Sequence, residues 1–481
     1  MQAADNAGLT IESAADPAIR RDVTALVTRA RTAQRIAVCY DQARINDVVA
    51  AAGWAIIEPR RNRALAELAV ADTGVGVVED KVRKNHRKTL GLLRDLQAAT
   101  TVGVISEDAA TGIVEIARPV GVVCAVTPST NPAATPANKI LNSLAARNAV
   151  IVAPSPKGWG TCALLLRFVH EQLDRIGAPR DLVQMLPAPV TKASTAELMR
   201  RCDLVVATGS QANVRAAYRC GTPAFGVGAG NVASIVDETA DLADAARKIA
   251  DSKTFDNATS CSSENSVVIV DAVFDRMVAA LQAEGGVSLD ANQKRRLQQA
   301  MWPDGKLSPQ AIGQSAARVA AGAGLADVAA AGPRMLLVQE TDTGPAHPFS
   351  GEKLSPVLTV YRARDFADAC ALVERIYAFQ GAGHSVSLHS KLPERALHLG
   401  LTAPVSRVIV EQAHCFATGG SFDNGLPFSL SMGCGTWGGN NFSDNMGVRH
   451  YMNITRVSRP IPERVPTEEA LFGGFFSRYG R

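Results

Sequence analysis

The chain has 481 residues, which is more than one hydrophobic core usually serves, so two or three domains are expected. Hydrophobic residues make up 47% and charged residues 20% of it, and an aromatic content of only 5% argues against a stacking surface for nucleic acid. The formal net charge of +4 is spread along the chain. This composition indicates a soluble protein of enzyme size that has no nucleic acid as a partner.

Three local patterns exclude further classes. A short basic segment, 81–88, lies in a helical pattern and is interpreted as a solvated helix face. No run of eighteen apolar residues occurs and the chain does not begin like a secretion signal, so no membrane partner and a cytoplasmic location are expected. The nine cysteines form no C-x-x-C pair and no Cys/His knuckle, so neither a metal site nor a disulfide framework is expected.

Helical patterns open the chain. They cover about 19–35 and 41–68, the latter interrupted at Pro59, and a third pattern ends near Leu96. From 102 to 117, two β-rich stretches joined by Glu-Asp-Ala-Ala-Thr-Gly predict a protruding hairpin. A hairpin inserted between helices often serves subunit contact.

From residue 121 the chain alternates strictly between apolar runs and helical patterns. The runs are GVVCAVTP, AVIVAP, LVQMLP and DLVVATG, and helical patterns follow at about 136–147, 161–176, 194–200 and 211–220. This order predicts a parallel sheet with both faces covered, in which ligands bind at the carboxyl ends of the strands. Three of these ends carry small or polar residues, in TPSTNP, APSPKGWG and ATGSQ.

A second unit is expected to begin near Ser252, after an amphipathic helix at 242–250. Its first loop, FDNATSCSSE, leads into the apolar strand SVVIV, and α/β sequence continues to about Asn440. The tail, 448–481, has one β-like stretch followed by frayed polar sequence.

Cys261 lies in that first loop, where small neighbours leave its sulfur room to meet a substrate. Most cysteines are buried and inert, and Cys261 differs from the other eight by its loop setting. Taken with Cys261, three distant segments resemble the aldehyde dehydrogenase family: TPSTNP at 127–132, ATGS at 207–210 and EKLSPV at 352–357. Their order and spacing match across about 20–455.

Longer stretches resemble the CoA-acylating branch of that family, which includes the aldehyde half of bifunctional alcohol/aldehyde dehydrogenases. They include VGVVCAVTPSTNPAATPANKILNSLAARNAVIVAPSP, DNATSCSSENSVVIV and GHSVSLHS. The resemblance implies an α/β fold with a Rossmann-type cofactor-binding domain at 19–98 and 119–250 and an α/β catalytic domain at 251–443. The remaining segments, 99–118 and 444–481, would form a small β oligomerisation element whose last strand extends a neighbour's sheet in a homodimer or homotetramer.

The resemblance also assigns the catalytic residues. Cys261 would be the nucleophile whose thiolate adds to the aldehyde carbon, and Asn131 would donate, with the backbone N–H of the cysteine, to the oxyanion. Without the family, Asn131 in its Asn-Pro pair is equally a turn former. For His384 and His450, orienting the nucleophile and a structural role both stay open.

For the cofactor, the resemblance implies a site on both units. Glu352 would grip the nicotinamide ribose, and Thr208 to Ser210 would place helix N–H groups at a pyrophosphate. Lys157 follows the position where NAD-dependent members carry an acid for the adenosine ribose, so NADP is favoured and NAD stays possible. The full expected set is Thr127, Pro128, Lys157, Thr208, Gly209, Ser210, Gly228 and Glu352.

One departure bears on the acyl acceptor. Hydrolytic members activate water with a glutamate in Glu-Leu-Gly-Gly, and Gly226 falls at that position here. Attack by water should then be slow, whereas thiol exchange is nearly isoenergetic, so coenzyme A is expected as co-substrate. The alternative is that another carboxylate, such as Glu264, replaces the missing one.

The substrate is expected to meet Ser421 and Asn424 and the glycines of 432–440, where close backbone approach is possible. This layout, with the later Arg449-His450-Tyr451, resembles acylating sulfoacetaldehyde dehydrogenases, which implies oxidation of a small anionic aldehyde to its acyl-CoA. The alternatives are a cysteine acyltransferase or thioesterase without nicotinamide, a hydrolytic aldehyde dehydrogenase, and an inactive scaffold.

Overall fold

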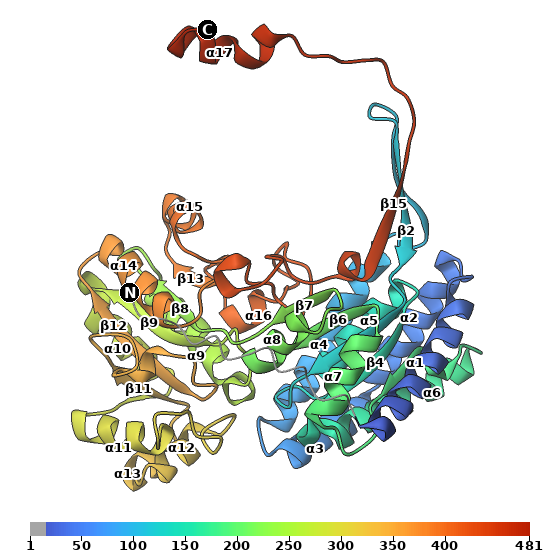
Figure 1. The fold of residues 1–481 in the computed structure, drawn as a ribbon. Helices are drawn as coiled ribbons and strands as arrows, with labels where there is room; N and C mark the ends of the chain where they lie inside the picture. The colour runs from blue at the N-terminus through green and yellow to red at the C-terminus, as the bar shows by residue number, and fades with distance from the viewer. Residues whose placement is uncertain (1–15) are drawn as a thin grey trace, which may run out of the picture.

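The computed structural model describes residues 16–481. The expectation that the chain does not begin like a secretion signal concerns residues that lie outside this range. Two α/β bodies lie side by side, and a β-ribbon and a C-terminal helix extend from them (Figure 1). No helix in the described part of the chain is both long and apolar enough to cross a membrane. The cytoplasmic location stays a prediction.

Four helices precede the first strand, as the sequence predicts. They are α1 (Pro17–Ala37), α2 (Gln42–Ile57), α3 (Pro59–Thr73) and α4 (Val78–Gln97). Pro59 separates α2 from α3 because proline is tolerated at the first position of a helix, where its missing N–H costs nothing. Glu58 caps α3 by accepting a hydrogen bond from the backbone N–H of Arg61 at 2.9 Å.

The first large sheet is fully parallel, in the order β5-β4-β3-β6-β7. Its strands are β3 (Val122–Thr127), β4 (Ala149–Pro154), β5 (Val183–Met185), β6 (Leu204–Thr208) and β7 (Ala224–Val227). The connecting helices are α5 (Ala134–Ala145), α6 (Trp159–Arg175), α7 (Lys192–Arg201) and α8 (Gln211–Arg219). Every residue of β3 and β4 is buried, as expected for strands covered on both faces. The predicted Rossmann-type alternation is confirmed.

The second large sheet is also parallel, in the order β10-β11-β12-β9-β8-β13-β14. Its strands are β8 (Val232–Val236), β9 (Glu264–Val270), β10 (Gly286–Ser288), β11 (Met335–Gln339), β12 (Val357–Ala363), β13 (Val386–His389) and β14 (Val408–Val410). Its helices are α9 (Leu242–Thr254), α10 (Phe274–Ala283), α11 (Ala291–Met301), α12 (Ala316–Gly322), α13 (Ala326–Ala330), α14 (Phe366–Phe379), α15 (Pro393–Thr402) and α16 (His414–Ala417).

The boundary between the two sheets differs from the expected one at residue 250. Strand β8 pairs with β9 and β13, and α9 packs on α10, so both belong to the second body. The change of sheet lies between Val227 and Val232. The sequence hides this because β8 continues the strand–helix alternation without a break.

A small antiparallel sheet projects from the first body (Figure 1). It contains β1 (Gly103–Asp108), β2 (Ile113–Pro119) and β15 (Met452–Ser458), which confirms the hairpin. The tail strand was expected to extend a neighbour's sheet, but in this structure β15 pairs with β2 of the same chain over seven residue pairs. The tail also forms a helix that frayed polar sequence did not predict, α17 (Glu468–Tyr479), capped by Thr467.

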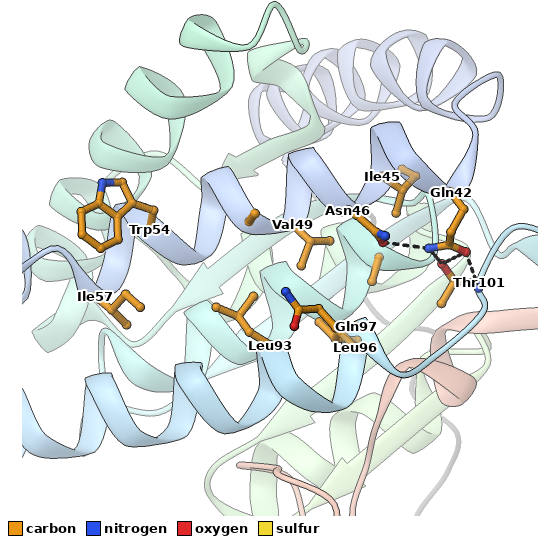
Figure 2. A pocket seen from close by; sticks show the side chains of 12 residues that line it. Gln42, Ile45, Asn46, Val49, Trp54, Ile57, Leu93, Leu96, Gln97 and Thr101 are labelled. Carbon is orange, nitrogen blue, oxygen red and sulfur yellow. Dashed lines mark hydrogen bonds between the residues drawn. The ribbon is translucent and has the colours of Figure 1, made fainter.

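A hollow lies between α2 and α4 on the first body (Figure 2). Its walls are mostly apolar, and Gln42 bonds to Asn46 and Thr101 at one end. None of the described residues that line it is titratable, so it offers no group for acid–base or nucleophilic chemistry. The chemistry lies elsewhere.

Candidate active site

The two parallel sheets each contribute one edge to the site. In the second sheet, β8, β9, β12 and β13 run parallel, so the loops before them meet at the amino edge. Gly230 precedes β8, Cys261 precedes β9, Glu352 precedes β12 and His384 precedes β13. Residues separated by more than a hundred positions are thereby brought together.

Cys261 lies beside a histidine. Its Sγ is 3.6 Å from Nε2 of His384, and Nδ1 of His384 is 2.6 Å from Oγ of Ser385. Burial raises the pKa of the Cys261 thiol to about 12, with Glu352 and Cys434 adding to the rise, and burial lowers the pKa of His384 well below its usual value. The resting pair is therefore a thiol next to a neutral imidazole.

Gly230 allows the loop before β8 to lie close to the loop that carries Cys261. A Cβ at this position would lie 2.3 Å from the carbonyl oxygen of Cys261, so no larger residue fits without a shift of the backbone. The N–H of Gly230 also donates to Oε1 of Glu352 at 3.2 Å. Burial raises the pKa of Glu352 to about 8, against the effect of that hydrogen bond. Sequence reasoning did not single out Gly230.

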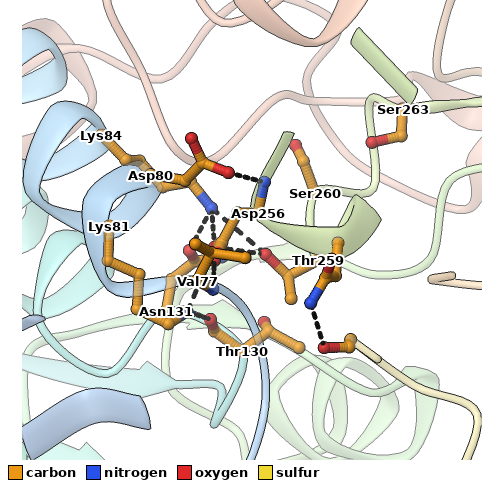
Figure 3. Close-up of polar contacts among 12 residues, drawn as sticks. Val77, Asp80, Lys81, Lys84, Thr130, Asn131, Asp256, Thr259, Ser260 and Ser263 are labelled. Carbon is orange, nitrogen blue, oxygen red and sulfur yellow. Dashed lines mark hydrogen bonds and ion pairs between the residues drawn. The ribbon is translucent and has the colours of Figure 1, made fainter. Parts of the chain in front are cut away.

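Asn131 reaches the site from the first sheet and is held by α4 (Figure 3). Nζ of Lys84 donates to Oδ1 of Asn131 at 2.8 Å, to Oδ2 of Asp256 at 2.6 Å and to Thr259 at 3.2 Å. The Nδ2 group of Asn131 has no hydrogen-bond acceptor among residues 16–481. Its N–H groups are thus available to a ligand.

Asp256 is the centre of this cluster. It is fully buried and pairs with Lys81 as well as Lys84, and it also accepts from the N–H of Val77 at 2.8 Å. Burial disfavours its charge, but Lys84 and Lys81 outweigh burial and lower the pKa of Asp256. The basic segment 81–88 was expected to be a solvated face, which is wrong for Lys81 and Lys84, with exposed fractions of 3% and 7%. A single buried carboxylate from another part of the chain stabilises both charges.

A pocket next to Asn131 is lined by the same helix. Four cations contribute to it, and no carboxylate is found among the described residues that line it. Its residues are Arg83, Lys84, Arg87, Lys88, Asn131, Phe255, Ser260, Cys415, Phe416 and Leu430. Because Ser260 directly precedes Cys261, the pocket lies between the thiol-bearing loop and α4, and it attracts anions.

The expected cofactor residues gather at the carboxyl edge of the first sheet. Thr127 ends β3 and Pro128 follows it, Lys157 follows β4, Thr208 ends β6 with Gly209 and Ser210 after it, and Gly228 follows β7. The Thr208 hydroxyl is held by Lys139 at 2.9 Å and by Ser431 at 2.8 Å.

Space for a ligand exists at this edge. Gly209 has a φ of +151°, and a Cβ there would meet no atom closer than 3.8 Å. A Cβ at Gly228 would lie 2.4 Å from the side chain of Gln211 in the first turn of α8, so a glycine keeps this strand end open. Lys157 is exposed. The residues present fit an extended phosphate-bearing cofactor.

The expected substrate residues are placed differently from one another. Ser421 is buried and accepts a hydrogen bond from Nη2 of Arg87 at 2.6 Å, so it supports one wall of the pocket that the four cations line. The Asn424 side chain is fully used by the protein: Oδ1 accepts from the N–H groups of Ser421 and Leu426, and Nδ2 donates to Gln412 at 3.0 Å. Nε2 of His450 lies 3.2 Å from Oδ1 of Asp444, and within residues 16–481 His450 forms no hydrogen bond with Cys261.

Position 226 has no room for a carboxylate. A Cβ at Gly226 would lie 2.7 Å from Val214 and 3.1 Å from Tyr218, and the Tyr218 hydroxyl donates to the Gly226 carbonyl. Glu264, the alternative carboxylate, is fully buried in β9 and faces the N–H of His414 at 3.4 Å. Burial raises its pKa to about 7.

Known proteins match this chain over nearly its whole length. The profile of the Aldehyde dehydrogenase family matches residues 10–303. An acylating sulfoacetaldehyde dehydrogenase of Cupriavidus necator is 68% identical and covers 95% of this chain and 93% of its own length. An acylating sulfoacetaldehyde dehydrogenase of Bilophila wadsworthia is 42% identical and covers 94% of this chain and 98% of its own length.

A solved structure agrees with the sequence relatives. The acetylating aldehyde dehydrogenase from Geobacillus thermoglucosidasius superposes with a TM-score of 0.89 at 33% identity, covering 94% of this chain and 99% of its own. The predicted resemblance and α/β fold are confirmed. The chain belongs to the aldehyde dehydrogenase family.

Proposed function

We propose that this protein oxidises sulfoacetaldehyde to sulfoacetyl-CoA, using NADP or NAD as the oxidant and Cys261 as the nucleophile. The observation that carries the proposal is that Cys261 contacts His384, while Ser260, the residue before Cys261, lines a pocket with Asn131 and four cations. The two relatives named as acylating sulfoacetaldehyde dehydrogenases support the same substrate.

The first step forms the nucleophile. A neutral His384 that donates from Nδ1 to Ser385 leaves Nε2 as the acceptor for the Cys261 proton. Arg407 donates to the His384 carbonyl at 3.2 Å and to Gly433 at 2.9 Å, which keeps the histidine in place. The thiolate then adds to the aldehyde carbon, a C–S bond forms, and the carbonyl electron pair moves onto oxygen.

Asn131 stabilises the oxyanion that results. Its Oδ1 is fixed by Lys84, its Nδ2 has no hydrogen-bond acceptor within residues 16–481, and Asn131 lines the pocket that Ser260 also lines. Preorganised donors of this kind are worth roughly 10²–10³ in kcat. When the oxyanion reforms the carbonyl, the C–H bond breaks and the product is a thioester on Cys261.

Residues on both sheets would hold the dinucleotide. Ser210 is the first residue before α8, whose amino end favours a phosphate, Gly209 leaves space beside it, and Glu352 lies on the side of Cys261. When bound, the oxidised nicotinamide supplies a positive charge and accepts the hydride that leaves the substrate carbon. Lys157, at the end of β4, supports NADP as the preferred form.

The acyl group then leaves to coenzyme A. The crowding of Gly226 by Val214 and Tyr218 leaves no space for a water-activating carboxylate at that position. A thiol needs no such base because its ordinary pKa of about 8.5 already gives some nucleophilic thiolate near neutral pH, whereas water has to be deprotonated. The CoA thiolate attacks the thioester carbon, Cys261 departs as the thiolate, and acyl-CoA is released.

We also propose that the protein is a homo-oligomer. Four large apolar side chains of α17 are exposed, with exposed fractions from 47% to 73%: Leu471, Phe472, Phe475 and Tyr479. A helix that reaches away from the body with such a face is stabilised when it packs on another chain (Figure 1).

Product analysis tests the proposed reaction. Sulfoacetaldehyde is mixed with NADP or NAD, with and without CoA, and reduced nicotinamide and acyl-CoA are both measured. We expect sulfoacetyl-CoA in equal amount to the reduced cofactor and no turnover by Cys261→Ala, which keeps cofactor binding. Free sulfoacetate formed steadily without CoA would indicate a hydrolytic enzyme, and acyl transfer without any nicotinamide change would indicate an acyltransferase.

A further inference from the structure

The four cations of the pocket are not equivalent, because two of them are already occupied. Lys84 uses its three donor positions on Asp256, Asn131 and Thr259, and the Asp256 carboxylate balances its charge. Nζ of Lys88 donates to the carbonyls of Gly419 at 2.7 Å and Gly420 at 3.2 Å. Burial, together with Arg87, lowers the pKa of Lys88 to about 7.

The two arginines keep donors free. Arg83 has neither a hydrogen bond nor an ion pair within residues 16–481, and its guanidinium lies over the rings of Phe416 at 5.0 Å and Phe255 at 5.9 Å. Arg87 donates to the carbonyl of Phe416 at 3.2 Å and to Ser421 at 2.6 Å, which leaves its remaining N–H groups unused. Aromatic faces hold both guanidinium groups, so the pocket is built before a ligand arrives.

The spacing of Arg83 and Arg87 favours the binding of an anion between them. Arg83 and Arg87 are four residues apart on α4, so both lie on one face of the helix, and like charges at this spacing repel. No carboxylate lines the pocket within residues 16–481, and the neighbouring Asp423, which accepts a hydrogen bond from Ser421, forms no ion pair with either arginine. A guanidinium presents a fixed fork of donors, which suits an oxyanion with several oxygen atoms.

We infer that Arg83 and Arg87 bind the sulfonate of the aldehyde substrate and set the specificity for anionic aldehydes. This assignment rests on the proposed function. In sulfoacetaldehyde one methylene separates the sulfonate from the aldehyde carbon, so the anion site has to share a pocket with the oxyanion donor. Arg83, Arg87 and Asn131 line one pocket, and Ser260 places the Cys261 loop against it.

The test compares a charged with an uncharged aldehyde. Arg83→Gln and Arg87→Gln are assayed for kcat/KM with sulfoacetaldehyde and with propionaldehyde, at saturating CoA and cofactor. Loss of a hydrogen bond to a charged group predicts a fall of roughly ten- to a hundredfold in the ratio of the two kcat/KM values. Arg94→Gln is the matched control, because Arg94 is on the same helix but pairs with Asp95 and does not line the pocket.

A second measurement needs no variant. Ethanesulfonate should inhibit propionaldehyde turnover by the unaltered enzyme competitively with the aldehyde, whereas the uncharged ethyl methyl sulfone should not. If the ratio of the two kcat/KM values is unchanged in both arginine variants, or if the two sulfur compounds inhibit equally, the arginines do not bind the sulfonate. The proposed function is unaffected by that result. An enzyme that acylates CoA from propionaldehyde but never from sulfoacetaldehyde overturns the proposed substrate and this assignment with it.

Discussion

Cys261 and His384 show how burial controls the nucleophile. Burial raises the pKa of Cys261 to about 12 and lowers the pKa of His384, so the free protein holds few thiolates at neutral pH. A thiol in this state resists adventitious oxidation and alkylation, which both require the thiolate. In the proposed mechanism the thiolate therefore forms when bound reactants stabilise its charge.

Alkylation of Cys261 by iodoacetamide should therefore depend steeply on pH. Well below the pKa, the thiolate fraction rises tenfold for each pH unit, so the rate at Cys261 should keep rising above the ordinary thiol pKa of about 8.5. Peptide mass spectrometry after timed labelling measures the rate at this one residue. An alkylation rate that stops rising at a pH near the ordinary thiol pKa would contradict a thiol pKa raised by burial.

Lys157 bears on the choice of cofactor. It is exposed at the end of β4, and if its charge meets a 2′-phosphate, Lys157→Glu should weaken NADP far more than NAD. Loss of a hydrogen bond to a charged group costs about 1.5–3 kcal/mol. Titration of both cofactors by fluorescence measures the two Kd values, and equal weakening would mean that Lys157 is a surface residue only.

At the scale of elements, the sequence predicted those features that local patterns determine. The alternation of strands and helices from β3 to α8 follows from short apolar runs, and Cys261 and Asn131 were found through loops and family motifs. His384 was weighed without a decision, and Gly230 was missed. Their roles come from contacts between loops far apart in the chain, for which one sequence holds no signal.

Helix α4 illustrates the same limit. Its basic segment has the pattern of a solvated face, and only the placement of Asp256 against it turns Lys84 into a buried residue that holds Asn131. One signal was present in the sequence: within 81–88 five of the residues are Lys or Arg and none is acidic. A basic cluster without acidic neighbours also occurs on protein surfaces. It therefore could not distinguish a solvated helix face from a buried one.

A double-mutant cycle tests this positioning role. Lys84→Met and Asn131→Ala should each lower kcat, by about tenfold and about a hundredfold, and the double variant should be no slower than Asn131→Ala. Lys81→Met is the control, since Lys81 also pairs with Asp256 but donates to Thr130 at 3.1 Å and not to Asn131. It should lose thermal stability with little change in kcat. Additive losses in the double variant would mean that Lys84 acts only through stability.

On the scale of the whole molecule, the two sheets divide the chemistry between them. The first sheet offers its carboxyl edge, where the general rule for α/β sheets places ligands, and the second offers its amino edge with Cys261 and Glu352. That rule agrees with the cofactor residues expected in the first sheet and could not predict the residues at the amino edge of the second. The site exists only where the two bodies meet.

The projecting sheet and α17 carry the proposed oligomer contacts. Removal of 459–481 leaves β15 intact and removes the exposed apolar side chains of α17, so the truncated protein should form a smaller assembly than the full chain. Phe472→Ser with Phe475→Ser, which keeps the helix, should act in the same direction. Light scattering after size-exclusion chromatography gives the mass of each, and an unchanged mass in both would remove α17 from the interface.

A burst of reduced cofactor in the absence of CoA distinguishes an acylating from a hydrolytic enzyme. In a rapid-mixing experiment with sulfoacetaldehyde and NADP but no CoA, one equivalent of reduced cofactor per active site should form, because hydride transfer needs only the Cys261 adduct. Turnover should then nearly stop, since Gly226 provides no base for water. Mass spectrometry should find the acyl group on Cys261, and added CoA should release it and restore turnover. Steady formation of reduced cofactor without CoA, at the rate seen with CoA, would contradict the acylating mechanism.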